Sequence, residues 1–315
     1  MLEFYKAIWR ASWRNQILLI ALSVAVAGLA AAPLKFQKEA INGLIDSKGL
    51  PILLQLCAGY LAVVLLSAAL KFLLNYRISL VGEGVIRYVR ERVYTLHVTE
   101  AAKGVRDLPQ KGTLLTMIST EAEDVGSFAG SAVADPLVMI GTLVSVIGFI
   151  MVAQPVLGLL ALGMILPQAV IVLAIQRRIN DRVRQRVQYL RASCDLISNS
   201  DLQQIENEAL RDFNEIYETR RKVFILKLSS KFVLKAINAS ATVGVLLLGG
   251  WLVIQGKSDV GTVVASLTGL TQISGPWLEL VTFFRGASTM RVRYEMLIDN
   301  VYMRDTVPPT GKVRM

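Results

Sequence analysis

The sequence contains few of the residue types on which most enzyme and metal sites depend. Its 315 residues include two cysteines and one histidine. Cys57 lies inside a long apolar run and Cys194 in a basic stretch, so the two thiols are not expected to form a disulfide or share a metal ion. A single histidine, His97, is more often structural than a ligand or a base. We therefore expect no catalytic and no metal-binding residues in this chain.

A loop that binds nucleotide phosphates is also missing. Such a loop arranges the backbone N–H groups of a glycine-rich turn around the phosphates, and Lys followed by Ser or Thr completes it. Gly256-Lys257-Ser258 has this ending, but Trp251 occupies the position of the motif's first glycine. The sequence therefore predicts that this chain is not an enzyme and binds no cofactor, neither ATP nor Mg²⁺.

Long uncharged runs dominate the sequence instead. About 20 apolar residues in a helix cross the hydrocarbon layer of a bilayer, and 53% of this chain is hydrophobic. Four runs reach that length singly, and a fifth is long enough for two crossings joined at Gln154-Pro155. The runs are residues 17–34, 52–70, 136–175, 236–254 and 260–278. We therefore expect an all-α membrane protein with six transmembrane helices.

The positive charges are distributed unequally between the two sides of the expected helices. Of 34 Lys and Arg residues, only Lys35, Lys38, Lys48 and Lys257 fall on one side. Lys and Arg gather on the cytoplasmic side, so we expect a multi-pass protein of the bacterial inner (plasma) membrane with both termini cytoplasmic. The net charge of +10 then fits basic segments that lie against anionic lipid head groups of the bilayer. No groove-reading element is present, so no nucleic acid is expected as a partner.

Two long polar segments lie between the expected spans on the cytoplasmic side. There is no proline between Pro51 and Pro109 or between Pro167 and Pro276, so helices can continue beyond the bilayer. We expect two long cytoplasmic helical hairpins that turn near residues 99–112 and 198–201, and short external loops at residues 37–50, 154–155 and 255–259. The tips of these arms are either solvated surface or handles for a cytoplasmic partner.

Several local sequences follow one another in a specific order. They are Gly112-Thr113-Leu114-Leu115, Gly249-Gly250-Trp251-Leu252-Val253-Ile254-Gln255-Gly256, Gly275-Pro276-Trp277-Leu278 and Tyr294-Glu295-Met296-Leu297-Ile298-Asp299. Their order and spacing resemble the transmembrane domain of ATP-binding-cassette (ABC) exporters over nearly the whole chain. The resemblance implies the type-1 transmembrane fold of ABC exporters over residues 1–300, with residues 301–315 as a cytoplasmic tail or truncated linker.

The resemblance also implies partners and an energy source outside this chain. A second transmembrane domain, identical or different, would complete a dimer, and a cytoplasmic nucleotide-binding domain carrying ATP and Mg²⁺ would dock on the arm tips. The coupling residues implied at these tips are Glu100, Lys103, Val105, Ser200, Asp201 and Leu202. Exporter domains usually continue into the ATPase, whereas this sequence stops shortly after Asp299. The ATPase is therefore expected on a separate chain or in a part lost by truncation.

One face of the last expected span is polar. Thr268, Gln272, Gly275 and Glu279 are spaced i, i+4, i+7 and i+11, which places them on one side of a helix. Polar groups are costly toward lipid, so this face should meet other helices or a cavity that contains water. One interpretation is helix packing through small and hydrogen-bonding residues, and the other is the lining of a substrate path.

Three functions are compatible with the sequence. The first is the transmembrane subunit of an ABC exporter-type transporter, coupled through its cytoplasmic loops to a separate ATPase. The second is a proton-driven transporter of the same fold that lacks an ATPase, with Glu279 as the candidate proton carrier. The third is a membrane scaffold whose arms hold a cytosolic partner. The residues of the polar face do not identify a substrate.

Overall fold

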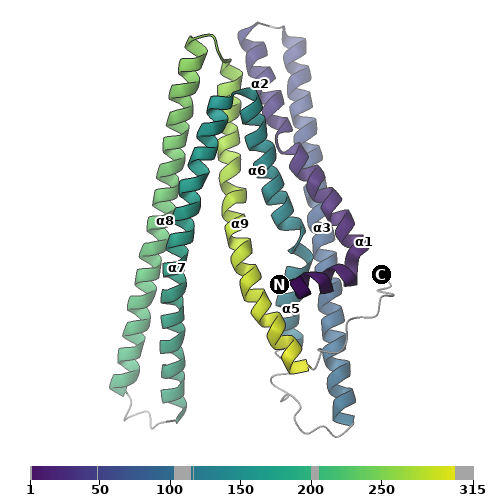
Figure 1. Ribbon diagram of the computed structural model, residues 1–315, viewed down its shortest axis with the longest axis vertical. Helices are drawn as coiled ribbons and strands as arrows, with labels where there is room; N and C mark the ends of the chain where they lie inside the picture. Colours follow the sequence, from purple (N-terminus) through teal and green to yellow (C-terminus); the bar gives the residue numbers. More distant parts are fainter. Residues whose placement is uncertain (1, 48, 103–114, 116, 200–205, 302–315) are drawn as a thin grey trace. The chain divides into compact units, whose positions relative to one another are not determined.

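A computed structural model describes residues 2–47, 49–102, 115, 117–199 and 206–301 as an assembly of long helices (Figure 1). Within these ranges there is no strand. The elements are α1 (Leu2–Leu29), α2 (Ala32–Ile45), α3 (Leu50–Ala102), the π-helix η1 (Met117–Glu121), α5 (Ala122–Ser131), α6 (Ala134–Ala153), α7 (Pro155–Asn199), α8 (Glu206–Ile254) and α9 (Val260–Val301). The predicted all-α fold is confirmed.

Five helical segments in the described part of the chain are long and apolar enough to cross a membrane. They are Trp13–Ile45, Leu50–Thr99, Ile118–Ala153, Pro155–Ile175 and Phe213–Ile254. The sixth predicted crossing, residues 260–278, is not among these five segments. It lies in α9, which has 42 residues, and Thr, Ser, Gln and Gly alternate there with the apolar residues. The chain is therefore a multi-pass integral membrane protein.

The connection between α2 and α3, predicted as the first external loop, is shorter than expected. The sequence predicts a loop at residues 37–50, but α2 continues to Ile45 and leaves only residues 46–49 before α3. Pro33 lies in the first turn of α2, where its fixed φ favours helix. The helix ends where the Asp46 N–H bonds the carbonyl of Asn42 and Ser47 adopts a φ of 52°. The prediction was wrong because polar side chains alone do not end a helix.

Contacts between helices group the chain into two compact units. Unit 1 comprises residues 1–153 and 259–315, and unit 2 comprises residues 154–258. Unit 2 is the pair of α7 and α8, whereas the other elements belong to unit 1. The predicted division into residues 1–300 and a tail of 301–315 stays a prediction, because residues 302–315 lie outside the described ranges.

Three of the four limbs of the expected arms are single long helices, whereas the returning limb of the first arm is divided into η1, α5 and the start of α6. α3 has 53 residues, and α7 and α8 have 45 and 49. At 1.5 Å per residue α3 is about 80 Å long, compared with about 30 Å for the hydrocarbon layer. Of the predicted turns at residues 99–112 and 198–201, residues 99–102 and 198–199 still belong to helices α3 and α7, and the other residues lie outside the described ranges.

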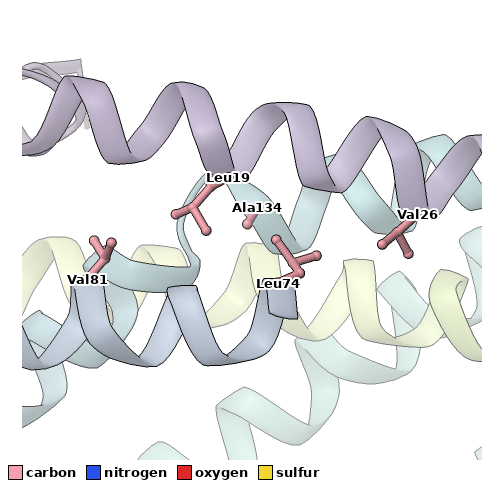
Figure 2. Close-up of a cluster of buried hydrophobic side chains, with 5 residues drawn as sticks. All are labelled: Leu19, Val26, Leu74, Val81 and Ala134. Atoms are coloured by element: carbon pink, nitrogen blue, oxygen red, sulfur yellow. The ribbon is translucent and has the colours of Figure 1, made fainter. Parts of the chain in front are cut away.

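A small apolar core in unit 1 joins α1, α3 and α6 (Figure 2). Leu19 and Val26 of α1 and Leu74 and Val81 of α3 are each spaced by seven residues, so each pair lies on one face of its helix. Together with Ala134 of α6, these side chains are at most 6% exposed. Because lipid is as apolar as these side chains, close packing rather than removal from water stabilises this contact.

Helices α3 and α5 approach each other closely at three glycines. A methyl group on Gly130 would lie 2.5 Å from the carbonyl oxygen of Ile78 and 3.1 Å from Cα of Gly82. A methyl group on Gly126 would lie 2.8 Å from the amide nitrogen of Ile86. Small residues permit this backbone-to-backbone contact between helices. In the first arm, α5 and the part of α3 around residues 78–86 therefore form a tightly packed helix pair.

Unit 2 is held together along the length of α7 and α8. The side chain of Gln168 donates a hydrogen bond of 2.8 Å to Asn238 Oδ1, and Gly244 leaves room for Leu160, which a methyl group there would approach to 3.3 Å. Leu157 and Ala161 of α7 and Val245 of α8 are buried. The hydrogen bond fixes how far one helix is displaced along the other.

Candidate functional site

The polar face predicted in the last span exists as one side of helix α9. Thr268 and Gln272 are half-buried, whereas Gly275 and Glu279 are exposed. Thr268 satisfies its hydroxyl by donating to the carbonyl of Val264 at 3.2 Å. A methyl group on Gly275 would have no atom within 4 Å. The helix thus presents a polar strip that becomes more accessible toward the cytoplasmic end predicted from the charges.

A different face of α9 packs against α6. Helical spacing places the buried residues Thr262, Ser266, Gly269 and Ile273 away from the polar strip. A methyl group on Gly269 would lie 2.9 Å from the Ile150 side chain, so α6 and α9 are in close contact there. The predicted path residues are therefore not the residues that hold α9 in place, and they stay candidates for contact with a transported molecule.

A second carboxylate lies near the polar strip and was missed by the sequence analysis. Asp135, at the beginning of α6, is close enough to Glu279 for the two charges to interact. The signal that could have revealed it is its place immediately before the uncharged run that starts at Pro136. Ionisable groups at membrane depth are costly and are commonly functional.

Aromatic rings connect the polar strip to the first arm. Phe128 of α5 stacks on Phe283 of α9 with 5.6 Å between ring centroids, and Phe283 meets Phe284 edge to face at 5.9 Å. Stacked and edge-to-face pairs of this kind are favourable beyond the area they bury. A movement of α5 would therefore reach α9 directly through these rings.

The C-terminal half of α2 and the N-terminal end of α9 are joined by a polar cluster that we call the latch: Lys38, Asn42, Asp259, Gly261 and Thr262. Asn42 Nδ2 donates to Asp259 Oδ1 at 2.8 Å, and Asn42 Oδ1 accepts from the Gly261 N–H at 2.8 Å. Asp259 also accepts from the Thr262 N–H at 2.6 Å, which caps the N-terminus of α9. Lys38 Nζ lies 3.4 Å from Asp259 Oδ2. The latch fixes the start of α9 to α2.

The surroundings of Asp259 favour its ionised form. Partial burial disfavours the charge, but hydrogen bonds from Asn42 and Thr262 and the positive charge of Lys38 outweigh it, so the pKa of Asp259 lies below its ordinary value. A carboxylate with such a lowered pKa stabilises the folded state at pH values above its unfolded pKa, which is about 4. That stabilisation is lost as the pH falls through the lower folded pKa.

We expect Asp259→Ala to lower the free energy of unfolding by about 2 kcal/mol at pH 7, because it removes the helix cap and the carboxylate that both Asn42 Nδ2 and Lys38 contact. Asp259→Asn keeps a side-chain oxygen for the Thr262 N–H and loses the attraction to a partly exposed lysine, so its cost should stay below about 1 kcal/mol. Thermal unfolding of the detergent-solubilised protein measures both. The difference between wild type and Asp259→Asn should shrink as the pH falls below 4, and an unchanged difference would contradict the charge argument.

The first arm contains a clamp between its two limbs. Arg90 of α3 donates from Nε to the carbonyl of Ile118 at 2.9 Å, and its Nη2 lies 3.9 Å from Glu123 Oε2. Ile118 belongs to the π-helix η1, a geometry that is often associated with functional sites. The neighbouring Arg87, in contrast, pairs with Glu91 of its own helix at 2.8 Å. Sequence reasoning could not single out Arg90 among the basic residues of the arm.

The residues predicted at the arm tips are mostly outside the described ranges. Glu100 lies in the last turn of α3, and its side chain is not described. Lys103, Val105, Ser200, Asp201 and Leu202 lie outside the described residues. The prediction that they couple the chain to an ATPase stays a prediction.

The Gly256-Lys257-Ser258 segment forms the turn between α8 and α9. The Gly256 N–H bonds the carbonyl of Val253 and the Lys257 N–H bonds that of Leu252, both at 2.9 Å, with Gly256 at a φ of 69°. This pattern is a Schellman motif, which satisfies the last carbonyls of a helix. These two amides are already used by the end of α8, so the segment does not offer them to a phosphate.

Comparison with known protein families supplies an independent test of the fold. The family described as ABC transporter transmembrane region matches residues 16–277 of the chain. This range begins in α1 and ends in α9, so it includes both arms and the polar strip as far as Gly275. No curated protein matched the sequence in a direct comparison.

Proposed function

Because the chain belongs to the family of ABC transporter transmembrane regions, we propose that it forms the substrate path of an exporter-type transporter that is coupled to an ATPase outside this sequence. The family match over residues 16–277 is the observation that carries the proposal. The helical arms, which are far longer than a bilayer is thick, support it because an ATPase in the cytoplasm must reach the transmembrane helices through rigid elements.

The proposed transporter contains two such transmembrane domains, from two copies of this chain or from a related one. Each arm tip docks on a cytoplasmic nucleotide-binding domain that binds ATP and Mg²⁺. The coupling contacts are Glu100, Lys103 and Val105 at the first tip and Ser200, Asp201 and Leu202 at the second. The uneven distribution of Lys and Arg supports placing both termini and both tips in the cytoplasm of a bacterial cell.

Transmission from the first tip to the substrate path follows a short series of contacts in unit 1. The Arg90 clamp joins α3 to η1, close glycine contacts join α3 to α5, and the Phe128–Phe283 stack joins α5 to α9. α9 carries Thr268, Gln272, Gly275 and Glu279. These contacts are all between packed helices. A displacement of the tip would therefore be passed on to the polar strip.

The interaction between Asp135 and Glu279 favours one alternative, a proton-driven transporter of the same fold. Two neighbouring carboxylates in a membrane protein can exchange a proton or a cation with a solvated pathway. In that case the arms would have no ATPase to dock on, and Glu279 would be indispensable for transport.

Transport assays in inside-out membrane vesicles distinguish these functions. With ATP added to the exposed cytoplasmic face, vesicles containing the chain and its ATPase should accumulate substrate when the pH gradient is abolished by an ionophore. The purified chain alone should hydrolyse no ATP. Transport that follows an imposed pH gradient without ATP, and that is lost in Glu279→Gln, would contradict the proposal and support the alternative. No transport under either condition would support a scaffold.

A further inference from the structure

Helix α8 carries two adjacent exposed stripes between Phe224 and Lys235. Lys227, Lys231 and Lys235 are spaced by four residues and are all exposed, and we call them the lysine stripe. Beside it lies an apolar stripe with the same spacing, Phe224, Leu228 and Phe232, which are 50%, 65% and 74% exposed. Residues three or four apart are neighbours on a helix surface. The two stripes therefore form one continuous amphipathic surface.

The lysine stripe has no acidic partner in the described structure. From residue 220 to residue 254 the sequence contains six basic residues and no Asp or Glu. Arg220 lies over the ring of Phe224 at 5.5 Å, and Arg221 pairs with Glu218 at 3.4 Å. None of the ion pairs among the described residues involves the three lysines of the stripe. Their charge is therefore available to an anion from outside the chain.

The hydrogen bond between Gln168 and Asn238 places the stripe at the edge of the membrane. Because α7 and α8 run in opposite directions and these two residues lie side by side, Ile175 at the end of the apolar segment of α7 lies at the level of Lys231. Lys235 is therefore level with residues of α7 that are still apolar. A lysine at this depth extends its side chain toward the head groups, where it finds phosphate.

We propose that the lysine stripe binds anionic phospholipid of the cytoplasmic leaflet, with the phosphates at Lys231 and Lys235 and an acyl chain along the exposed side of α8. Val243 lies three turns C-terminal to Phe232 on the same face of α8 and is 52% exposed. It therefore provides apolar surface for the acyl chain. Juxtamembrane lysines attract anionic lipid at the cytoplasmic surface. The proposal requires only that the chain spans a membrane with its arms in the cytoplasm, and it is independent of the energy source.

Native mass spectrometry of the purified full-length protein can test this with two lipids that share the same acyl chains. Phosphatidylglycerol supplies the anionic head group, and phosphatidylcholine is the zwitterionic reference. Each lysine near a membrane surface contributes roughly a fivefold gain in affinity for anionic lipid. The variant Lys227→Gln/Lys231→Gln/Lys235→Gln should therefore lose more than tenfold in phosphatidylglycerol affinity, and its phosphatidylcholine binding should not change.

A matched control removes the same number of exposed cations from parts of the arms that lie farther from the membrane. It combines Arg182→Gln, Arg211→Gln and Lys222→Gln. It should retain most of the phosphatidylglycerol binding. Equal losses in both triple variants would overturn the proposal, since they would mean that net charge alone attracts the lipid. A change in oligomeric state with unchanged lipid binding would also overturn it, because a second copy would then cover the stripe.

A single substitution keeps the proposal testable if the triple variant is not recovered in folded form. Lys231→Gln should weaken phosphatidylglycerol binding by roughly fivefold, whereas Lys231→Arg, which keeps the charge, should bind as wild type does. Equal binding by Lys231→Gln and Lys231→Arg would overturn the proposal.

Discussion

Gly130→Ala is expected to lower the free energy of unfolding by about 3 kcal/mol, the upper part of the range for overpacked cores. The added methyl group would lie 2.5 Å from the Ile78 carbonyl oxygen and 3.1 Å from Cα of Gly82. Both are backbone atoms, so no side chain can rotate away and α3 must separate from α5. Separation would also weaken the contact at Gly126. The measurement is the thermal unfolding midpoint of the purified protein in detergent.

Gly84→Ala is the matched control in the same region. A methyl group on Gly84 of α3 would have no atom within 4 Å, and alanine favours helix over glycine by up to about 1 kcal/mol. This variant should be as stable as wild type or slightly more stable. Equal destabilisation of Gly84→Ala and Gly130→Ala would mean that glycine is needed for flexibility, not for the close approach of two helices.

Leu202→Asp is expected to abolish ATP-driven transport and co-purification of the ATPase together. If the second tip docks on an ATPase, as proposed, the substitution places an unpaired carboxylate in the joint, at a cost of a few kcal/mol. Residue 202 lies outside the long uncharged runs of the sequence, so membrane insertion should continue. The measurements are ATP-dependent uptake in inside-out vesicles and the amount of ATPase that purifies with the chain.

Arg182→Asp is the control for a charge change on an arm away from its tip. Arg182 is exposed and its hydrogen bond to Gln185 at 3.2 Å stays within α7. Exposed positions of this kind shift stability by within about 0.5 kcal/mol, so transport should continue nearly unchanged. If Leu202→Asp had the same small effect, residue 202 would not be a coupling contact, and the proton-driven or scaffold function would gain support.

The sequence predicted those features that depend on composition over about 20 residues. Five apolar spans follow from uncharged runs, and the unbroken helix α3 follows from the absence of proline between Pro51 and Pro109. The polar strip on α9 follows from helical periodicity. These properties are local, so they can be read from neighbouring residues.

Contacts between distant segments were not predictable in this way. The latch joins Asn42 to Asp259, and the clamp joins Arg90 to Ile118. Nothing near Asn42 in the sequence distinguishes it from other polar residues at the end of a helix, and Arg90 is one of several arginines on α3. The grouping of α7 and α8 as a separate unit also depends on which helices meet, and one sequence does not contain that information.

The latch also determines when unit 1 can be completed during synthesis. Asn42 and Asp259 are 217 residues apart, and ribosomes add about 5–20 residues per second. The start of α9 therefore emerges roughly 10–40 s after Asn42. Meanwhile α7 and α8, which are consecutive in the chain, have both been made and can already pair. The C-terminal end of α2 thus waits for its partner while unit 2 assembles, and the nascent protein is exposed to proteases and misassembly throughout that interval.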